Sequence, residues 1–236
     1  MNQYRNIEEK YSRTFGLKKR PVAVKFQATP PPGVAKFEGL EPSGCSFWRL
    51  AAAGRTFYTV PSDHYNCAVG SHTHNIALPA ERAQELEQTL TFMTGLGYIK
   101  MEEVPGIPRL EQTPGVVVYS PLGETPVDPD VVIFAGPAAQ IMLLQEAAQR
   151  AGRAAQIPML GRPTCMALPA ALAHGAVTSS GCIGNRVYTD LGEGELYSVV
   201  SGKDIARIAD ELEIIAAANA KLADYHKSRR VEIATA

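Results

Sequence analysis

The chain has 236 residues, 45% of them hydrophobic and 20% charged, with a formal net charge of −1. A chain of this size and composition can bury enough apolar surface to fold without a disulfide or metal staple. Its basic residues form no stripe and only balance the acidic ones, so nucleic acid is not an expected partner. Residues 1–10 are polar and no run of about 18 apolar residues occurs, so we expect no signal peptide, no membrane span and a cytoplasmic location.

The pattern of apolar residues predicts strands and helices that alternate along the chain. Short β-branched runs indicate strands, and apolar residues repeated every three or four positions indicate helices. This mixture is typical of an α/β fold in which helices pack on mixed sheets. In chain order we expect a helix at 5–15, a strand at 21–26, a short helix after Cys45, a helix at 79–94, strands at 115–119 and 129–134, a helix at 137–151, a short helix after Cys165 and a helix at 203–224.

The order of these elements is similar in two halves, about 18–105 and 115–224, of a single domain spanning 1–236. In each half a strand is followed by a cysteine, Cys45 or Cys165, that leads into an Ala-rich helix ending at glycine. A second cysteine, Cys67 or Cys182, then lies close to glycine, and an amphipathic helix follows. This repeat predicts two similar strand–helix halves related by a pseudo-two-fold axis, with the cysteines converging near the axis.

These four cysteines are the strongest functional candidates in the chain. In a reducing compartment such residues are better explained as metal ligands or redox groups than as disulfides. Structural zinc sites usually take closely spaced cysteine pairs, which the sequence lacks, so zinc stays an alternative without its usual signature. A [4Fe–4S] cluster accepts thiolates from separate loops, and flanking glycines allow backbone N–H groups to approach its sulfides. We therefore expect an iron–sulfur cluster of the [4Fe–4S] type, bound by Cys45, Cys67, Cys165 and Cys182.

Two arginines occupy matched positions relative to these cysteines. Arg49 follows Cys45 by the same interval at which Arg186 follows Cys182. Guanidinium groups so placed are expected to bind the cofactor by stabilising its negative charge. Arg162 also lies close in sequence to a cysteine.

Histidines and aromatic residues leave two other classes of function open. His64, His72 and His74 surround Cys67, and one of them could activate that thiol in a hydrolase or transferase. The polar context favours solvent-facing histidines instead. Aromatic residues near the first two cysteines, including Phe47, could wall a haem with His or Cys as axial ligand. The sequence thus favours a redox or electron-transfer role, with a Cys/His thiolate enzyme and a non-catalytic zinc- or haem-binding protein as alternatives.

The cysteine-containing segments resemble those of the uncharacterised archaeal-cysteine-rich (ArCR-type) family, a domain of unknown function found in anaerobic archaea and bacteria. The resemblance extends over about residues 18–215 and implies that the cysteines belong to a shared pattern and that a role in anaerobic metabolism is plausible. It implies no particular reaction. As partners we expect a small molecule or a redox partner, and a homo-oligomer stays open. The segments that carry the resemblance are 21–26, 45–58, 67–70, 119–122, 129–132, 165 and 181–186.

Overall fold

Seven strands form a single sheet in the computed structural model, which describes residues 3–16, 18–153 and 156–235. The strand order is β2-β3-β1-β4-β7-β6-β5. Neighbouring strands are antiparallel except β5 and β6, which are parallel. The sheet is mixed, as predicted, but it is one continuous sheet. Its strands are β1 (Val22–Gln27), β2 (Phe57–Thr59), β3 (Val116–Pro121), β4 (Val131–Pro137), β5 (Met159–Leu160), β6 (Ala176–Ser179) and β7 (Glu195–Ser201).

The centre of the sheet is buried on both faces, which accounts for the unbroken apolar runs in the predicted strands. All six residues of β3 are buried. Along β4, Val131 and Ile133 belong to one apolar core, and Val132 and Phe134 belong to the other. This alternation follows from the pleat of the strand, which points successive side chains to opposite faces. Helices therefore cover both faces of the sheet.

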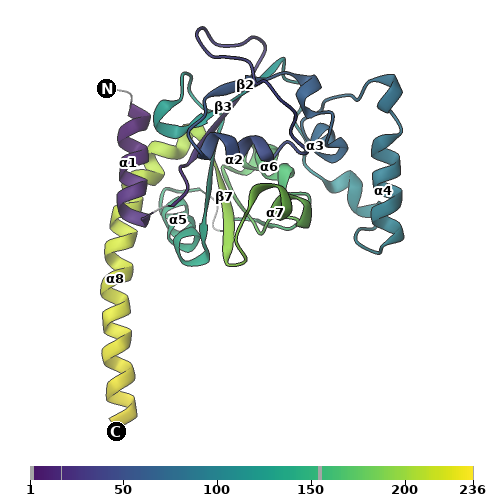
Figure 1. The fold of residues 1–236 in the computed structure, drawn as a ribbon. Helices are drawn as coiled ribbons and strands as arrows, with labels where there is room; N and C mark the ends of the chain where they lie inside the picture. Colours follow the sequence, from purple (N-terminus) through teal and green to yellow (C-terminus); the bar gives the residue numbers. More distant parts are fainter. Residues whose placement is uncertain (1–2, 17, 154–155, 236) are drawn as a thin grey trace.

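Three helices cover the first face: α1 (Gln3–Phe15), α5 (Ala138–Arg150) and the start of α8 (Ile205–Thr235). The helix predicted at 203–224 continues to Thr235, but its buried residues end at Leu212. The rest of α8 projects beyond the body of the protein (Figure 1). Within the described ranges, no helix combines the length and apolar character needed to cross a membrane.

Short helices cover the opposite face of the sheet. The residues Phe47 and Trp48 of α2 (Ser46–Ala52) and Leu168 of α6 (Ala167–His174) are buried in its core. Two more, α3 (Ala68–Thr73) and α7 (Ile183–Thr189), lie on the same side (Figure 1). The chain enters each of these four helices at or just after a cysteine, so this face positions the candidate site. Single 3-10 turns complete the path at η1 (Pro61–His64), η4 (Leu122–Glu124), η5 (Thr164–Met166) and η6 (Gly202–Asp204).

The two halves of the chain contain matching elements in the same order. The series β1, α2, β2, α3, β3 in the first half has its parallel in β4, α6, β6, α7, β7 in the second, where α5 and β5 are additional. Strands β1 and β4 pair antiparallel in the middle of the sheet, with Val22 opposite Ile133. Outward from them lie β3 and β2 on one side, and β7 and β6 on the other. Element order and pairing agree with the predicted duplication, and the pseudo-two-fold axis itself stays a prediction.

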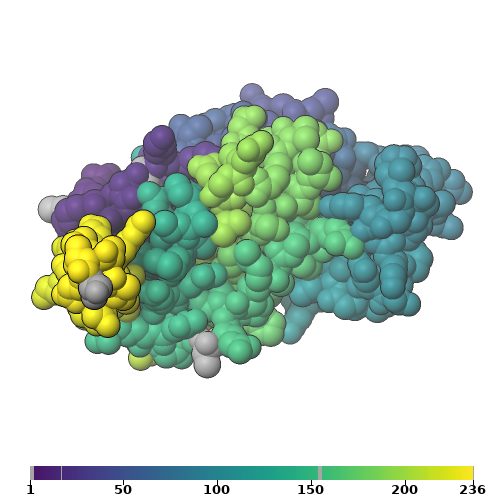
Figure 2. All heavy atoms as spheres, turned by 90° about the horizontal axis from the view of Figure 1, so that it is seen from below, coloured from purple at the N-terminus to yellow at the C-terminus, as the bar shows by residue number. Residues whose placement is uncertain are grey.

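One helical segment separates α3 from β3, whereas only a short loop joins α7 to β7. We call this segment, residues 79–107, the α4 flap. It contains η2 (Ala80–Arg82), α4 (Glu85–Gly95) and η3 (Met101–Gly106). None of the residues in these three elements is buried. The flap forms a lobe at the end of the molecule opposite the C-terminus of α8 (Figure 2).

Candidate functional site

All four cysteines, which lie far apart in the sequence, line the same cavity of about 510 Å³. Two of them come from each half of the chain. Cys45 and Cys165 are 7% exposed, and Cys67 and Cys182 are half-buried. The four are free thiols. Cysteines from both halves therefore line a single cavity.

Each cysteine is held at the start of a helix. Cys45, Cys67 and Cys182 occupy the N-cap positions of α2, α3 and α7, and Cys165 lies in η5, directly before α6. The first turn of a helix leaves backbone N–H groups without an internal partner, and these can donate to sulfur. At Cys67 this occurs, because the N–H of Gly70 donates to its Sγ at 3.2 Å.

Two contacts, one between the halves and one within the second half, join the cysteine-bearing loops in pairs. The Sγ of Cys165 lies 4.0 Å from the carbonyl oxygen of Val69, in the segment that follows Cys67. The backbone N–H of Cys182 donates to Thr164 Oγ1 at 2.5 Å, immediately before Cys165. These contacts fix the loops of Cys67, Cys165 and Cys182 against one another.

Cys45 is held by polar groups from both halves. Its Sγ lies 3.2 Å from Ser43 Oγ. Burial raises the pKa of the Cys45 thiol to about 11, while the neighbouring Ser43 hydroxyl and Asn185 amide act in the opposite direction. Asn185, at the start of α7, is 1% exposed and also lines the cavity. Cys67 and Cys182 add to the rise in pKa, since neighbouring thiolates repel.

The thiols of Cys67 and Cys165 are also raised in pKa. For Cys67 burial is the main cause, partly offset by the backbone N–H groups of Gly70 and Gly44. Glycine at position 70 permits this approach, because a Cβ there would lie 3.0 Å from the Cys67 sulfur. For Cys165 burial comes first and repulsion from the Cys67 thiolate second. Without a cationic ligand, these buried thiols keep their protons at neutral pH.

The cysteines are the residues that could hold a cofactor. Within the described part of the chain, no group of three or more His, Cys, Asp or Glu side chains is arranged to hold a metal ion. The four sulfur atoms line the wall of a cavity larger than one ion requires.

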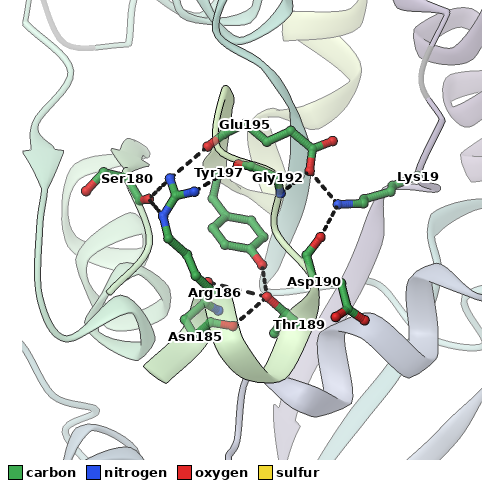
Figure 3. Close-up of polar contacts among 9 residues, drawn as sticks. All are labelled: Lys19, Ser180, Asn185, Arg186, Thr189, Asp190, Gly192, Glu195 and Tyr197. Carbon is green, nitrogen blue, oxygen red and sulfur yellow. Dashed lines mark hydrogen bonds and ion pairs between the residues drawn. The ribbon is translucent and has the colours of Figure 1, made fainter. Parts of the chain in front are cut away.

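The two arginines expected at the cofactor do not line this cavity. Arg49 lies 3.9 Å from Glu41 and its side chain is 43% exposed. The guanidinium of Arg186 donates to three backbone carbonyls, at 2.5 Å to Ser180, 2.8 Å to Gly192 and 3.1 Å to Glu195 (Figure 3). These hydrogen bonds occupy the donors of the guanidinium, so Arg186 holds the loops on either side of α7 together.

Arg162 is the arginine that does line the cavity. Its guanidinium lies 3.1 Å from the Glu103 carboxylate and 4.9 Å from the centre of the Tyr98 ring. Both partners belong to the α4 flap. Arg162 precedes Cys165 in sequence, but its distant partners could not be inferred from that position.

Two of the three histidines near Cys67 are not solvent-facing as expected, and the third, His72, is half-buried. His64 and His74 are 2% and 1% exposed, and burial lowers the pKa of both. His64 Nε2 lies 2.8 Å from Thr59 Oγ1, and His74 Nδ1 lies 2.9 Å from the Gly70 carbonyl. No histidine is among the described residues that line the cavity.

Phe47, which was expected to wall a haem, does not line the cavity either. Phe47 and Trp48 pack in the core beneath α2. The α4 flap provides the apolar wall instead, and the amphipathic pattern at 79–94 was the sequence signal for it. The flap residues that line the cavity are Thr89, Leu90, Met93, Tyr98, Ile99, Glu103, Val104, Gly106 and Ile107.

Comparison with known proteins agrees with the resemblance noted in the sequence. No curated protein and no solved structure matches the chain. The sequence profile of one family, DUF169, described as uncharacterised ArCR, matches residues 11–211. This range covers most of the 236 residues. The protein therefore belongs to the uncharacterised ArCR family of domains of unknown function.

Proposed function

We propose that the protein binds one [4Fe–4S] cluster through Cys45, Cys67, Cys165 and Cys182 and acts as a one-electron carrier. The observation that carries this proposal is that all four cysteines line one cavity, two from each half of the chain. Four thiolates from separate loops are a sufficient ligand set for such a cluster. These cysteines would hold the cluster, which would supply one-electron transfer between a reduced and an oxidised carrier, with no bond formed or broken.

The surroundings of the thiols support an iron–sulfur cluster. Ser43 and Asn185 stabilise the Cys45 sulfur, and Gly44 and Gly70 stabilise the Cys67 sulfur. Donors of this kind hold the sulfur ligands and set the potential of a bound cluster. Burial raises the pKa of three of the thiols, so ionisation of the set requires a cation, which iron would provide.

The same features disfavour a thiolate enzyme. A nucleophilic cysteine needs a lowered pKa or an adjacent base. Here burial raises the pKa of Cys45, Cys67 and Cys165, and the described cavity lining contains no histidine. Zinc binding is an outcome that the following experiment separates from the cluster.

Anaerobic reconstitution with ferrous iron and sulfide tests the proposal. We expect four iron and four sulfide ions per chain, and a brown chromophore that bleaches with dithionite and gives a paramagnetic signal. Each of the four Cys→Ser variants should lose most of the iron, whereas His72→Gln, which changes a half-buried side chain near Cys67, should keep it. Zinc bound in place of iron after reconstitution, or full iron content in any two of the serine variants, would overturn the cluster assignment.

A further inference from the structure

The cavity has a second wall that the cysteines do not use. Besides the thiols, it is lined by apolar side chains of the α4 flap, among them Leu90, Met93 and Val104. Its volume, about 510 Å³, falls in the range typical of pockets for small organic molecules. A cluster of eight inorganic atoms against the cysteines therefore leaves space beside this apolar wall.

One cationic side chain lines that space. Among the described residues that line the cavity, Arg162 is the only lysine or arginine. Its side chain is 38% exposed. It lies three positions before Cys165, on the body of the protein, while the two groups it contacts, Glu103 and Tyr98, lie on the flap. Arg162 thus lines the cavity and joins the body to the flap.

Glu103 occupies the position that an anionic ligand would take. Its carboxylate lies 3.1 Å from Arg162, and its side chain is 46% exposed. An ion pair with both partners exposed contributes little to stability, so another carboxylate can replace it at small cost. The Tyr98 ring holds the guanidinium from its face and leaves the edge donors available to the ligand.

The flap itself is suited to adjust around a ligand. The elements η2, α4 and η3 contain no buried residue. Phe92, Leu96 and Met101 are more than half exposed. A segment with so few buried contacts lies at the low-stability end of the structure, from which ligand-binding elements are drawn.

We propose that this cavity binds a small organic anion with an apolar body. The anionic group pairs with Arg162 and displaces Glu103, and the apolar body lies against Leu90, Met93 and Val104. This inference rests on the proposed function in one respect: when the cluster is bound, the apolar body of the ligand lies beside it.

Fluorescence titration with 8-anilinonaphthalene-1-sulfonate, an apolar anion, tests the site on the full chain. Arg162→Gln should weaken binding about 10-fold or more, since hydrogen bonds to a charged group are lost. Glu103→Gln should tighten binding several-fold, because the competing carboxylate is removed. Glu85→Gln is the matched control: it also removes a flap carboxylate paired with an arginine, at 2.5 Å from Arg82, but one outside the described cavity lining.

Competition separates anion recognition from general apolar binding. Octanoate should displace the probe, whereas octanamide, which has the same chain without the charge, should displace it at least about 10-fold less well. Equal competition by the two compounds, or no difference between Glu103→Gln and Glu85→Gln, would overturn the anion site.

Titrations of both the iron-free and the reconstituted protein separate this proposal from the cluster. If iron is bound but Arg162→Gln and Glu103→Gln have no effect on the probe, the anion site is wrong and the cluster stands. If no iron is bound but the variants behave as expected, the cluster is wrong and the anion site stands. Since Glu103→Gln alters only an exposed side chain, it remains informative if Arg162→Gln does not fold.

Discussion

Replacement of Arg186 distinguishes a structural role from a cofactor-binding one. The guanidinium donates to the carbonyls of Gly192, just before β7, of Glu195, the first residue of β7, and of Ser180, just before Cys182. A hydrogen bond from a charged donor contributes about 1.5–3 kcal/mol. Two of the bonds share one carbonyl and the arginine is half-buried, so water can compensate in part. We expect Arg186→Gln to lower the free energy of unfolding by about 3 kcal/mol.

Urea unfolding and calorimetry measure this loss. For a chain of this size, about 3 kcal/mol corresponds to a melting temperature lower by roughly 6–12 °C. Arg49→Gln is the matched control, since Arg49 occupies the same position after Cys45, and its 3.9 Å pair with Glu41 predicts a change under about 0.5 kcal/mol. If Arg186→Gln left stability unchanged but shifted the potential of a reconstituted cluster, Arg186 would be a cofactor residue and the structural interpretation would be wrong.

Three further predictions concern the fold. The Tyr4 hydroxyl donates to Asp128 at 2.8 Å, and burial together with that carboxylate raises the pKa of Tyr4 to about 12. The folded state holds this proton more tightly than the unfolded state does. The contribution of protonated Tyr4 to folding stability is therefore complete below the unfolded pKa of 10.0 and is lost as the pH rises through about 12. Tyr4→Phe should accordingly show a shallower alkaline loss of stability in urea titrations. Gly202→Ala would place a Cβ against the backbone carbonyl oxygen of Pro129 and should lower folding stability by at least about 3 kcal/mol or prevent folding. In the control Gly161→Ala, the Cβ meets nothing within 4 Å, and the loss of stability should be under about 1 kcal/mol. Equal circular-dichroism melts of the two variants would contradict this prediction. A stop codon after Asp224 removes residues 225–235, which are exposed throughout. Calorimetry should find a melting temperature within about 2 °C of that of the full chain. A larger drop would mean that this part of α8 is packed in solution.

Local signals explain why much of the fold was predictable. The β-branched runs of β3 and β4 are buried on both faces, which is the environment that such runs indicate. Glycine marks the end of the two Ala-rich helices predicted after Cys45 and Cys165: Gly54 and Gly175 have φ values of +104° and +82°, which side chains disfavour. The similarity of the halves was visible because each half carries these same signals in the same order.

The features that sequence reasoning missed depend on distant partners. His64 and His74 lie in a polar segment, yet both are buried, each with one ring nitrogen in contact with Thr59 or with a backbone carbonyl. Arg186 looked like a charge beside a cysteine, but its donors are taken by carbonyls brought together by the loops around α7. Arg162 gained its position in the cavity from contacts with the flap. Spacing along the chain carries no information on such pairings.

The two walls of the cavity have different origins in the chain, and this difference can be tested. The thiol wall comes from elements that occur in both halves, whereas the apolar wall comes from the α4 flap, which the second half lacks. Replacing residues 80–106 with a Gly/Ser linker of equal length removes the second wall and none of the cysteines. Because η2, α4 and η3 contain no buried residue, we expect the body to stay folded and to keep its iron after anaerobic reconstitution, while binding of the anionic probe is lost. Loss of iron together with the probe would show that the flap is part of the thiol site, and that cluster and ligand cannot be assigned to separate walls.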